Sequence, residues 1–159
     1  MQTVTVQDIN NPVFSDAPSG SLPAECDAVP KPADICVTDN CNYLSTKFTE
    51  VRVNGNCPDR YNLVRTWAAT DRCGNQKNAT HTIVVDDTKA PVFDGPAPVS
   101  SQVDCDKVPV VAAPTAHDNC AEVVPQDHST TEHICKNGWV TEYSWSASDE
   151  CGHTSWRIF

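Results

Sequence analysis

The chain has little positive charge and no long apolar run. Its 159 residues include 11 Lys and Arg against 21 Asp and Glu, which gives a formal net charge of −10. Nucleic-acid-binding proteins carry basic patches, so this balance argues against a nucleic-acid partner. No apolar stretch approaches the ~20 residues that a membrane-spanning helix needs. We therefore expect no membrane span.

The sequence also lacks the common motifs of catalysis. It contains no Gly-x-Ser-x-Gly, no His-Glu-x-x-His and no glycine loop of the kind that cradles phosphate. The five histidines are scattered, and none has a nucleophile nearby in sequence. His117 beside Asp118 is better explained as a turn residue than as a base. We therefore predict that the protein is not an enzyme.

Cysteine is abundant: there are nine, and none is in a Cys-x-x-Cys pair. Eight are spaced by 15 to 16 residues within two sets of four, namely Cys26, Cys41, Cys57, Cys73 and Cys105, Cys120, Cys135, Cys151. Zinc sites use closely paired ligands, so a reduced or zinc-binding protein is the weaker alternative. Two disulfides per unit in an extracellular compartment are expected instead. Because no signal peptide follows Met1, the chain is expected to be a segment of a longer precursor or an expressed fragment.

The chain repeats itself about every 79 residues. Pro12-Val13-Phe14 returns at 91–93, and Asp39-Asn40-Cys41 returns at 118–120. The stretch from Trp67 to Gly74 returns, 78 residues later, as 145–152. Such a period indicates one small domain used twice. Domains this small usually need additional stabilisation, such as disulfide bonds. The predicted organisation is a strand at 1–8, a first domain at 9–88 and a second domain at 89–159.

Alternation of apolar and polar residues predicts an all-β fold. Strands are expected at 3–8, 47–53, 61–69, 82–87 and 139–147, with a turn at 54–56. No stretch has convincing helical periodicity. Many short strands in about 80 residues predict two tandem β-sandwich domains of immunoglobulin type, with the tryptophans of each repeat in the core.

The motifs make a more specific resemblance. Three motifs follow one another: Asp-Asn-Cys, then Trp-x-Ala-x-Asp-x-Cys-Gly, then an acidic strand end followed by 87–93 (Asp-Thr-Lys-Ala-Pro-Val-Phe). In this order they are similar to the hyalin-repeat (HYR-like) family in its four-cysteine form. The resemblance covers nearly the whole chain. It implies an immunoglobulin-like sandwich with an adhesive or scaffolding role in secreted and cell-surface proteins, and it supplies no catalytic residues. Cys36 departs from the pattern, because Thr115 occupies its position in the second copy.

The repeat is out of phase with the domains. At the 78-residue offset Phe159 corresponds to His81, so the second copy stops before its last strand. Residues 3–8 match that strand, 82–87, at an offset of 79. We expect Thr3, Val4, Thr5 and Val6 to complete the second domain of a neighbouring copy, which would build a head-to-tail homopolymer. The alternatives are a window on a longer covalent array and a first strand that is simply disordered.

Four cysteines in each domain allow three pairings. The pairings favoured by the expected loop positions are Cys26–Cys57, Cys41–Cys73, Cys105–Cys135 and Cys120–Cys151. Cys36 is left over, either as a free buried thiol or as a link between chains. Asn78-Ala79-Thr80 is an N-glycosylation acceptor, expected in a polar turn.

Acidic residues recur in register and predict calcium sites where one unit joins the next. The candidate ligands are Asp8, Asp39, Asn40 and Asp71 for the first domain, and Asp87, Asp118, Asn119 and Asp149 for the second. Three carboxylates and an amide oxygen suit Ca²⁺, which takes six to eight oxygen ligands. The alternative is that Asp and Asn are good turn formers and bond only their own backbone.

These features favour a structural repeat protein of an extracellular filament, stalk or matrix. The alternative is an adhesin or receptor module that presents loops to a glycan or protein. That alternative predicts exposed aromatic residues at one loop end, for which Trp156 is the candidate.

Overall fold

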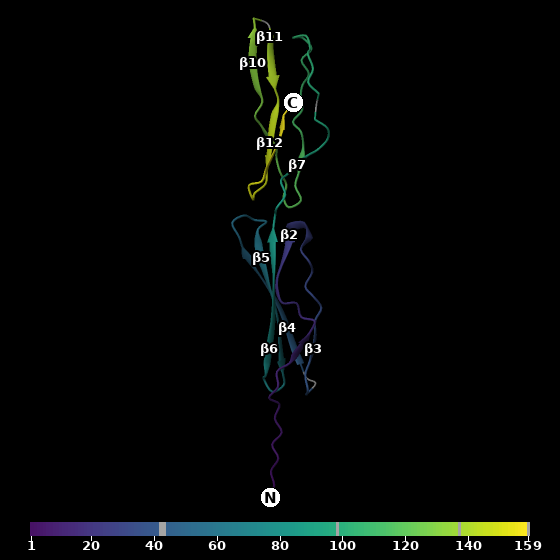
Figure 1. Cartoon of the computed structure of the whole chain (residues 1–159), viewed down its shortest axis with the longest axis vertical. Helices are drawn as coiled ribbons and strands as arrows, with labels where there is room; N and C mark the ends of the chain where they lie inside the picture. The colour runs from purple at the N-terminus through teal and green to yellow at the C-terminus, as the bar shows by residue number, and fades with distance from the viewer. Residues whose placement is uncertain (42–43, 98, 137, 159) are drawn as a thin grey trace. The chain divides into compact units, whose positions relative to one another are not determined.

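A computed structural model describes residues 1–41, 44–97, 99–136 and 138–158, and Phe159 lies outside these ranges. Apart from one short 3-10 turn, Cys26–Ala28, the regular structure described is all strand. The chain divides into two compact units, Met1–Asp86 and Asp87–Phe159 (Figure 1). Residues 1–8 are grouped with the first unit. None of the described helical structure is long and apolar enough to cross a bilayer.

Unit 1 is built on a four-stranded sheet in the order β2-β6-β5-β4. Its strands are β2 (Gly20–Glu25), β4 (Leu44–Asn54), β5 (Tyr61–Asp71) and β6 (Gln76–Asp86). The long β4–β5 and β5–β6 pairs are antiparallel. A second, two-stranded sheet joins β1 (Val13–Ser15) to β3 (Cys36–Thr38). The predicted strands at 47–53 and 61–69 are therefore present within longer strands, and the predicted strand at 82–87 is present as far as Asp86, where β6 ends.

β2 joins this sheet through the second half of β6. The two strands are parallel, from Gly20 opposite His81 to Glu25 opposite Asp86. β2 contains Pro23, which has no backbone N–H and therefore suits an edge strand. β2 thus lies at the edge of the sheet and pairs only with residues 81–86.

Alternation along β5 and β6 builds the core of unit 1. Trp67 and Ala69 of β5 are buried, as expected for the tryptophan of the repeat. Ile83 and Val85 of β6 are both fully buried, with 0% exposure. The Phe48 ring of β4 also contacts Trp67, with ring centroids 5.2 Å apart. The second half of β6 therefore pairs with two strands and also supplies two core side chains.

Unit 2 has shorter strands in three sheets, with the orders β7-β8, β10-β11 and β13-β12-β9. The strands are β7 (Val92–Phe93), β8 (Ala116–His117), β9 (Gln126–Asp127), β10 (Thr130–Cys135), β11 (Gly138–Glu142), β12 (Ser144–Ser148) and β13 (Thr154–Ile158). Its core consists of Phe93, Trp145 and Ala147, with Tyr143 and others packed against it. Trp145 and Ala147 are the repeat counterparts of Trp67 and Ala69.

Within the described residues, unit 2 has no strand in the place that residues 81–86 take in unit 1. β13 ends at Ile158, which corresponds to Thr80 of β6 at the 78-residue offset. Residues 99–104, the counterpart of β2, are not in a strand. β11 pairs only with β10. In unit 1, by contrast, all six residues of β2 pair with residues 81–86.

The predicted strand at 3–8 is not formed. Residues 3–7 are exposed, with Val4 at 76% and Val6 at 92% exposure, and have no strand assignment. A single extended segment without a neighbour has no partner for its backbone N–H and C=O groups, so nothing holds it as a strand. Figure 1 shows this segment running away from unit 1 as a separate chain end.

Disulfide bonding differs from the prediction of four bonds. Four cysteines, Cys26, Cys57, Cys120 and Cys151, are disulfide-bonded. The predicted bonds Cys41–Cys73 and Cys105–Cys135 are not formed, because these four cysteines carry exposed free thiols, and so does Cys36. Cys36 is exposed, so the expectation of a buried thiol is wrong, and a link between chains stays a prediction.

The free Cys105 and Cys135 differ from their repeat counterparts. Their repeat counterparts, Cys26 and Cys57, are bonded. Cys26 directly follows β2, whose last residue is opposite Asp86, and Arg60 of the β4–β5 turn donates to Asp86 (Nε–Oδ1 2.6 Å). Residues 99–104, which precede Cys105, are not in a strand.

Asn78 lies within β6, opposite Ala68 of β5, and not in the polar turn that we predicted. The strand begins at Gln76, because the turn between β5 and β6 is shorter than expected. The Asn78 side chain is exposed, so the acceptor site is accessible even though its backbone is in a sheet.

Candidate functional site

Each unit contains a cluster of three aspartates at the end where the chain enters it. The first aspartate lies on the entering segment and the second follows a short strand. The third is the last residue of β5 in unit 1 and directly follows β12 in unit 2. The clusters are Asp8, Asp39 and Asp71 in unit 1, and Asp87, Asp118 and Asp149 in unit 2. All six are among the residues predicted from the sequence.

The first and second aspartates of each cluster form the same local turn. The Oδ1 atom of Asp8 accepts from the Asn10 backbone N–H, and that of Asp87 accepts from Lys89, both at 3.1 Å. In the second position, the Cys41 and Cys120 backbone N–H groups donate to Oδ1 of the aspartate two residues earlier at 2.9 Å. These bonds are the turn-forming role that was the alternative to metal binding. They use only one oxygen of each carboxylate.

The third aspartate lies at the start of a glycine turn. The Asn75 backbone N–H donates to Asp71 Oδ1 at 2.8 Å, and that of His153 donates to Asp149 Oδ1 at 2.9 Å. Gly74 has φ 93° and its counterpart Gly152 has φ 94°, a conformation that side chains strongly disfavour. The Asp-x-Cys-Gly motif therefore places the third carboxylate identically in both units.

The second carboxylate oxygen is left without a partner at four positions. The Oδ2 atoms of Asp8, Asp39, Asp87 and Asp118 are buried and have no hydrogen-bond partner among the described residues. They are the first and second aspartates of the two clusters. A buried carboxylate oxygen without a compensating partner is unfavourable, since the group has lost its contacts with water. That the same two atoms are unpartnered in both units indicates a shared structural feature.

The clusters are compact and buried. Carboxylate oxygens of Asp8 and Asp39 lie within 4.8 Å of each other, as do those of Asp87 and Asp149. Asp8 is 9% and Asp87 only 1% exposed. Like charges at such separations repel, and low solvent exposure weakens the screening of that repulsion.

The pKa directions follow from this geometry. Burial raises the pKa of Asp87. The hydrogen bond from the Lys89 backbone opposes this rise, and the negative charges of Asp118 and Asp149 add to it. Burial opposes ionisation of Asp149 too, but hydrogen bonds from His153 and its charge hold that pKa below its usual value. The pKa of Asp8 is lowered, chiefly by the hydrogen bond from the Asn10 backbone.

The groups around the aspartates differ between the units. Asn75 Nδ2 donates to Asp71 Oδ2 at 2.6 Å, whereas the His153 ring contacts Asp149 Oδ2 through Nδ1 at 2.8 Å. The Cys41 sulfur lies with the carboxylates of Asp8 and Asp39 within 4.8 Å, and its counterpart Cys120 is disulfide-bonded. Only the three carboxylates and the neighbouring asparagine recur. Sequence reasoning missed Asn75 and His153, although both directly follow the glycine of the repeated turn.

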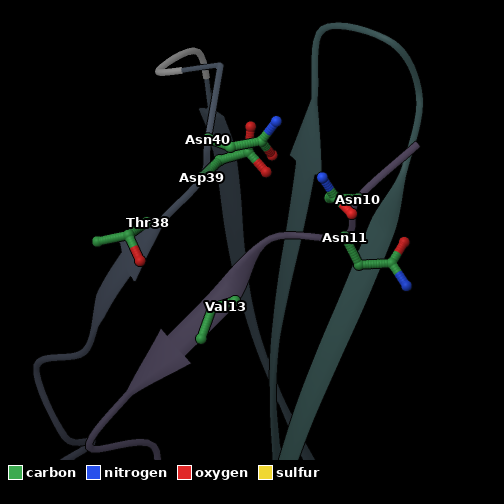
Figure 2. Close-up of a pocket in the computed structure, with 6 residues that line it drawn as sticks. All are labelled: Asn10, Asn11, Val13, Thr38, Asp39 and Asn40. Carbon is green, nitrogen blue, oxygen red and sulfur yellow. The ribbon is translucent and has the colours of Figure 1, made fainter. Parts of the chain in front are cut away.

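The predicted asparagines lie beside their clusters. Asn40 donates from Nδ2 to Asp8 Oδ1 at 3.3 Å, and Asn119 donates to the Cys120 sulfur at 3.1 Å. A hollow of about 400 Å³ opens next to the unit 1 cluster, lined by Asn10, Asn11, Val13, Thr38, Asp39 and Asn40. Figure 2 shows it between the entering chain at Asn10 and the loop at Asp39. The loop side of this cluster can therefore be reached from solvent.

Trp156, the candidate for a glycan- or protein-binding loop, lies on β13 and not in a loop. Its ring is 59% exposed and packs against the His128 ring, with centroids 4.9 Å apart. A single aromatic residue on a strand provides little of the loop-end surface that the adhesin alternative predicts.

No protein-family model matches the chain, and no curated protein matches it. The resemblance to hyalin repeats therefore stays a prediction from the motifs.

Proposed function

We propose that the protein is a structural repeat unit of an extracellular filament, stalk or matrix. Its two units are immunoglobulin-like domains, and copies join head-to-tail when residues 3–8 of one copy complete unit 2 of the next. Two disulfides support an oxidising, extracellular setting. The partner is a second copy of the same chain.

The observation that carries the proposal is a contrast between equivalent residues. Ile83 and Val85 are fully buried in β6, whereas Val4 and Val6, their counterparts 79 residues earlier, are 76% and 92% exposed. The same alternating pattern is thus core in one setting and solvent-exposed in the other. Burying two such side chains contributes ~1.5–3 kcal/mol each.

The pairing within unit 1 gives the register of the proposed joint. Ile83 is opposite Leu63, and Val85 is opposite Tyr61. Moved into unit 2, this register puts Val6 opposite Trp139 and Val4 opposite Thr141 of β11. Trp139 is 38% exposed, so an apolar side chain is available beside the incoming strand.

The other side of the joint corresponds to β2. Ala24 is opposite Val85 in the parallel pair, and its counterpart is Val103, which is 46% exposed. An incoming strand would pair with β11 on one side and with residues 99–104 on the other. The donor segment and the acceptor site are different surfaces of the chain. Two joined copies therefore still have one free donor segment and one free acceptor site, and the assembly grows as a line.

A capping experiment tests this function. A synthetic peptide of residues 1–10 should occupy unit 2 and shorten the assemblies seen by negative-stain electron microscopy. A matched peptide with Val4→Asp and Val6→Asp should leave them unchanged, because it cannot place charged side chains in the core. Uniformly monomeric particles of the chain at all concentrations, or equal effects of the two peptides, would refute strand complementation.

A further inference from the structure

We propose that each unit holds one Ca²⁺ ion between its three aspartates. The ligands in unit 1 are Asp8, Asp39 and Asp71, and those in unit 2 are Asp87, Asp118 and Asp149. The inference rests on the four unpartnered, buried Oδ2 atoms, which lie at the same two positions of both clusters. Turn formation uses Oδ1 and gives no reason for the second oxygen to be buried.

The burial of neighbouring carboxylates favours a bound cation. Asp87 is 1% exposed and has an unpartnered Oδ2, and an Asp149 carboxylate oxygen lies within 4.8 Å of its carboxylate. Three carboxylates in one buried place repel one another. A bound divalent cation reverses this repulsion and supplies the missing partner for each Oδ2 atom.

The comparison between the two clusters selects the metal. Zinc prefers sulfur and imidazole ligands, and each is present in only one cluster: the Cys41 thiol in unit 1 and the His153 ring in unit 2. The oxygen donors common to both clusters are the three carboxylates. Ca²⁺ accepts six to eight oxygens in flexible geometry, with water filling open positions, whereas Mg²⁺ demands a near-ideal octahedron. The shared set therefore fits Ca²⁺ best.

The position of Asp8 links this site to assembly, a consequence that rests on the proposed strand exchange. Asp8 is the last residue of the donor segment 3–8, and the unit 1 cluster holds it through contacts to Asn40 and Asn75. Calcium at this cluster would fix the end of the donor segment at unit 1. The donor would then be pre-organised before it meets the next copy, so calcium should favour assembly.

The test uses a full chain with Val4→Asp and Val6→Asp, which cannot donate its strand. Both side chains are exposed, so this chain should fold normally. Isothermal titration with CaCl₂ should count two ions per chain, and the melting midpoint should be higher in CaCl₂ than in EDTA. MgCl₂ and ZnCl₂ at the same concentration should give clearly smaller shifts.

Asp-to-Asn variants in this background locate the ions. Asn keeps the Oδ1 acceptor, so the turns should survive. Asp8→Asn should reduce the count to one ion, and Asp39→Asn with Asp118→Asn should abolish uptake. The latter variant should melt in EDTA at or above its parent, because the repulsion is relieved. Asp34→Asn, at an exposed position outside the clusters, should change nothing.

The proposal is overturned if the parent binds no calcium, if the cluster variants bind as much as the parent, or if zinc stabilises it more than calcium. Because these chains cannot exchange strands, such a failure would say nothing against strand complementation. Conversely, calcium uptake with a wild-type chain that never assembles would sustain the sites and refute the joint.

Discussion

Truncating the two apolar side chains of the donor segment should weaken assembly by a calculable amount. In the proposed joint, Val4 and Val6 take the places of Ile83 and Val85, which are fully buried in β6. Val→Ala removes the equivalent of two methylene groups, each worth ~0.8 kcal/mol when buried. The double variant Val4→Ala/Val6→Ala should therefore lose ~3 kcal/mol per joint. This corresponds to a dissociation constant about 200-fold larger.

Mass photometry or sedimentation velocity over a dilution series measures this constant. The same substitutions should leave the melting midpoint of the separated chain unchanged, because both valines are exposed there. Thr5→Ala is the matched control: its counterpart Val84 lies on the outer face of β6 and is 39% exposed. Equal assembly of wild type and double variant, or equal loss in the Thr5 control, would contradict the proposed register.

Three further outcomes follow from the same structure. Adding the 1–10 peptide in a glutathione redox buffer should convert Cys105 and Cys135 from free thiols to a disulfide, because the incoming strand would supply a pairing partner for residues 99–104. Peptide mapping measures this conversion, and two thiols that stay free would argue against the prediction. Gly74→Ala should cost ~1–3 kcal/mol in unfolding experiments, since φ is 93° there, and an unchanged midpoint would show that the turn relaxes. Trp67→Ala should cost ~3–5 kcal/mol by denaturant titration because Trp67 is 6% exposed, whereas Trp156→Ala on the exposed face should cost far less; similar losses would refute the assignment of the core.

The sequence was sufficient to identify the long strands of unit 1. Period-two alternation is clear in 61–69, where one face is packed and the other solvated, and the structure places these residues in β5. The exact repeat of Asp-Asn-Cys and Asp-x-Cys-Gly was also enough to identify four of the six aspartates that form the two clusters, and the acidic end of the segments 3–8 and 82–87 identified Asp8 and Asp87. Local turn chemistry fixes their backbone, and it is the same in both copies.

Features that depend on distant partners could not be predicted in the same way. Alternation at 3–8 shows that the segment can form a strand, but a strand forms only where a neighbour supplies hydrogen bonds, and Val6 is exposed. Cys105 carries a free thiol although its spacing matches that of the disulfide-bonded Cys26, so sequence spacing alone does not determine which cysteines are bonded. Asn75 and His153 were missed because residues of different chemistry occupy one turn position.

Hydrogen–deuterium exchange of the assembled chain tests the central claim most directly. Strand complementation predicts that the amides of residues 4–7 and of 99–104 become protected together as the chain concentration rises, because both segments gain backbone hydrogen bonds in the same joint. The protection should disappear from both segments in Val4→Ala/Val6→Ala. Assemblies in which residues 4–7 exchange as fast as in the separated chain would contradict the account.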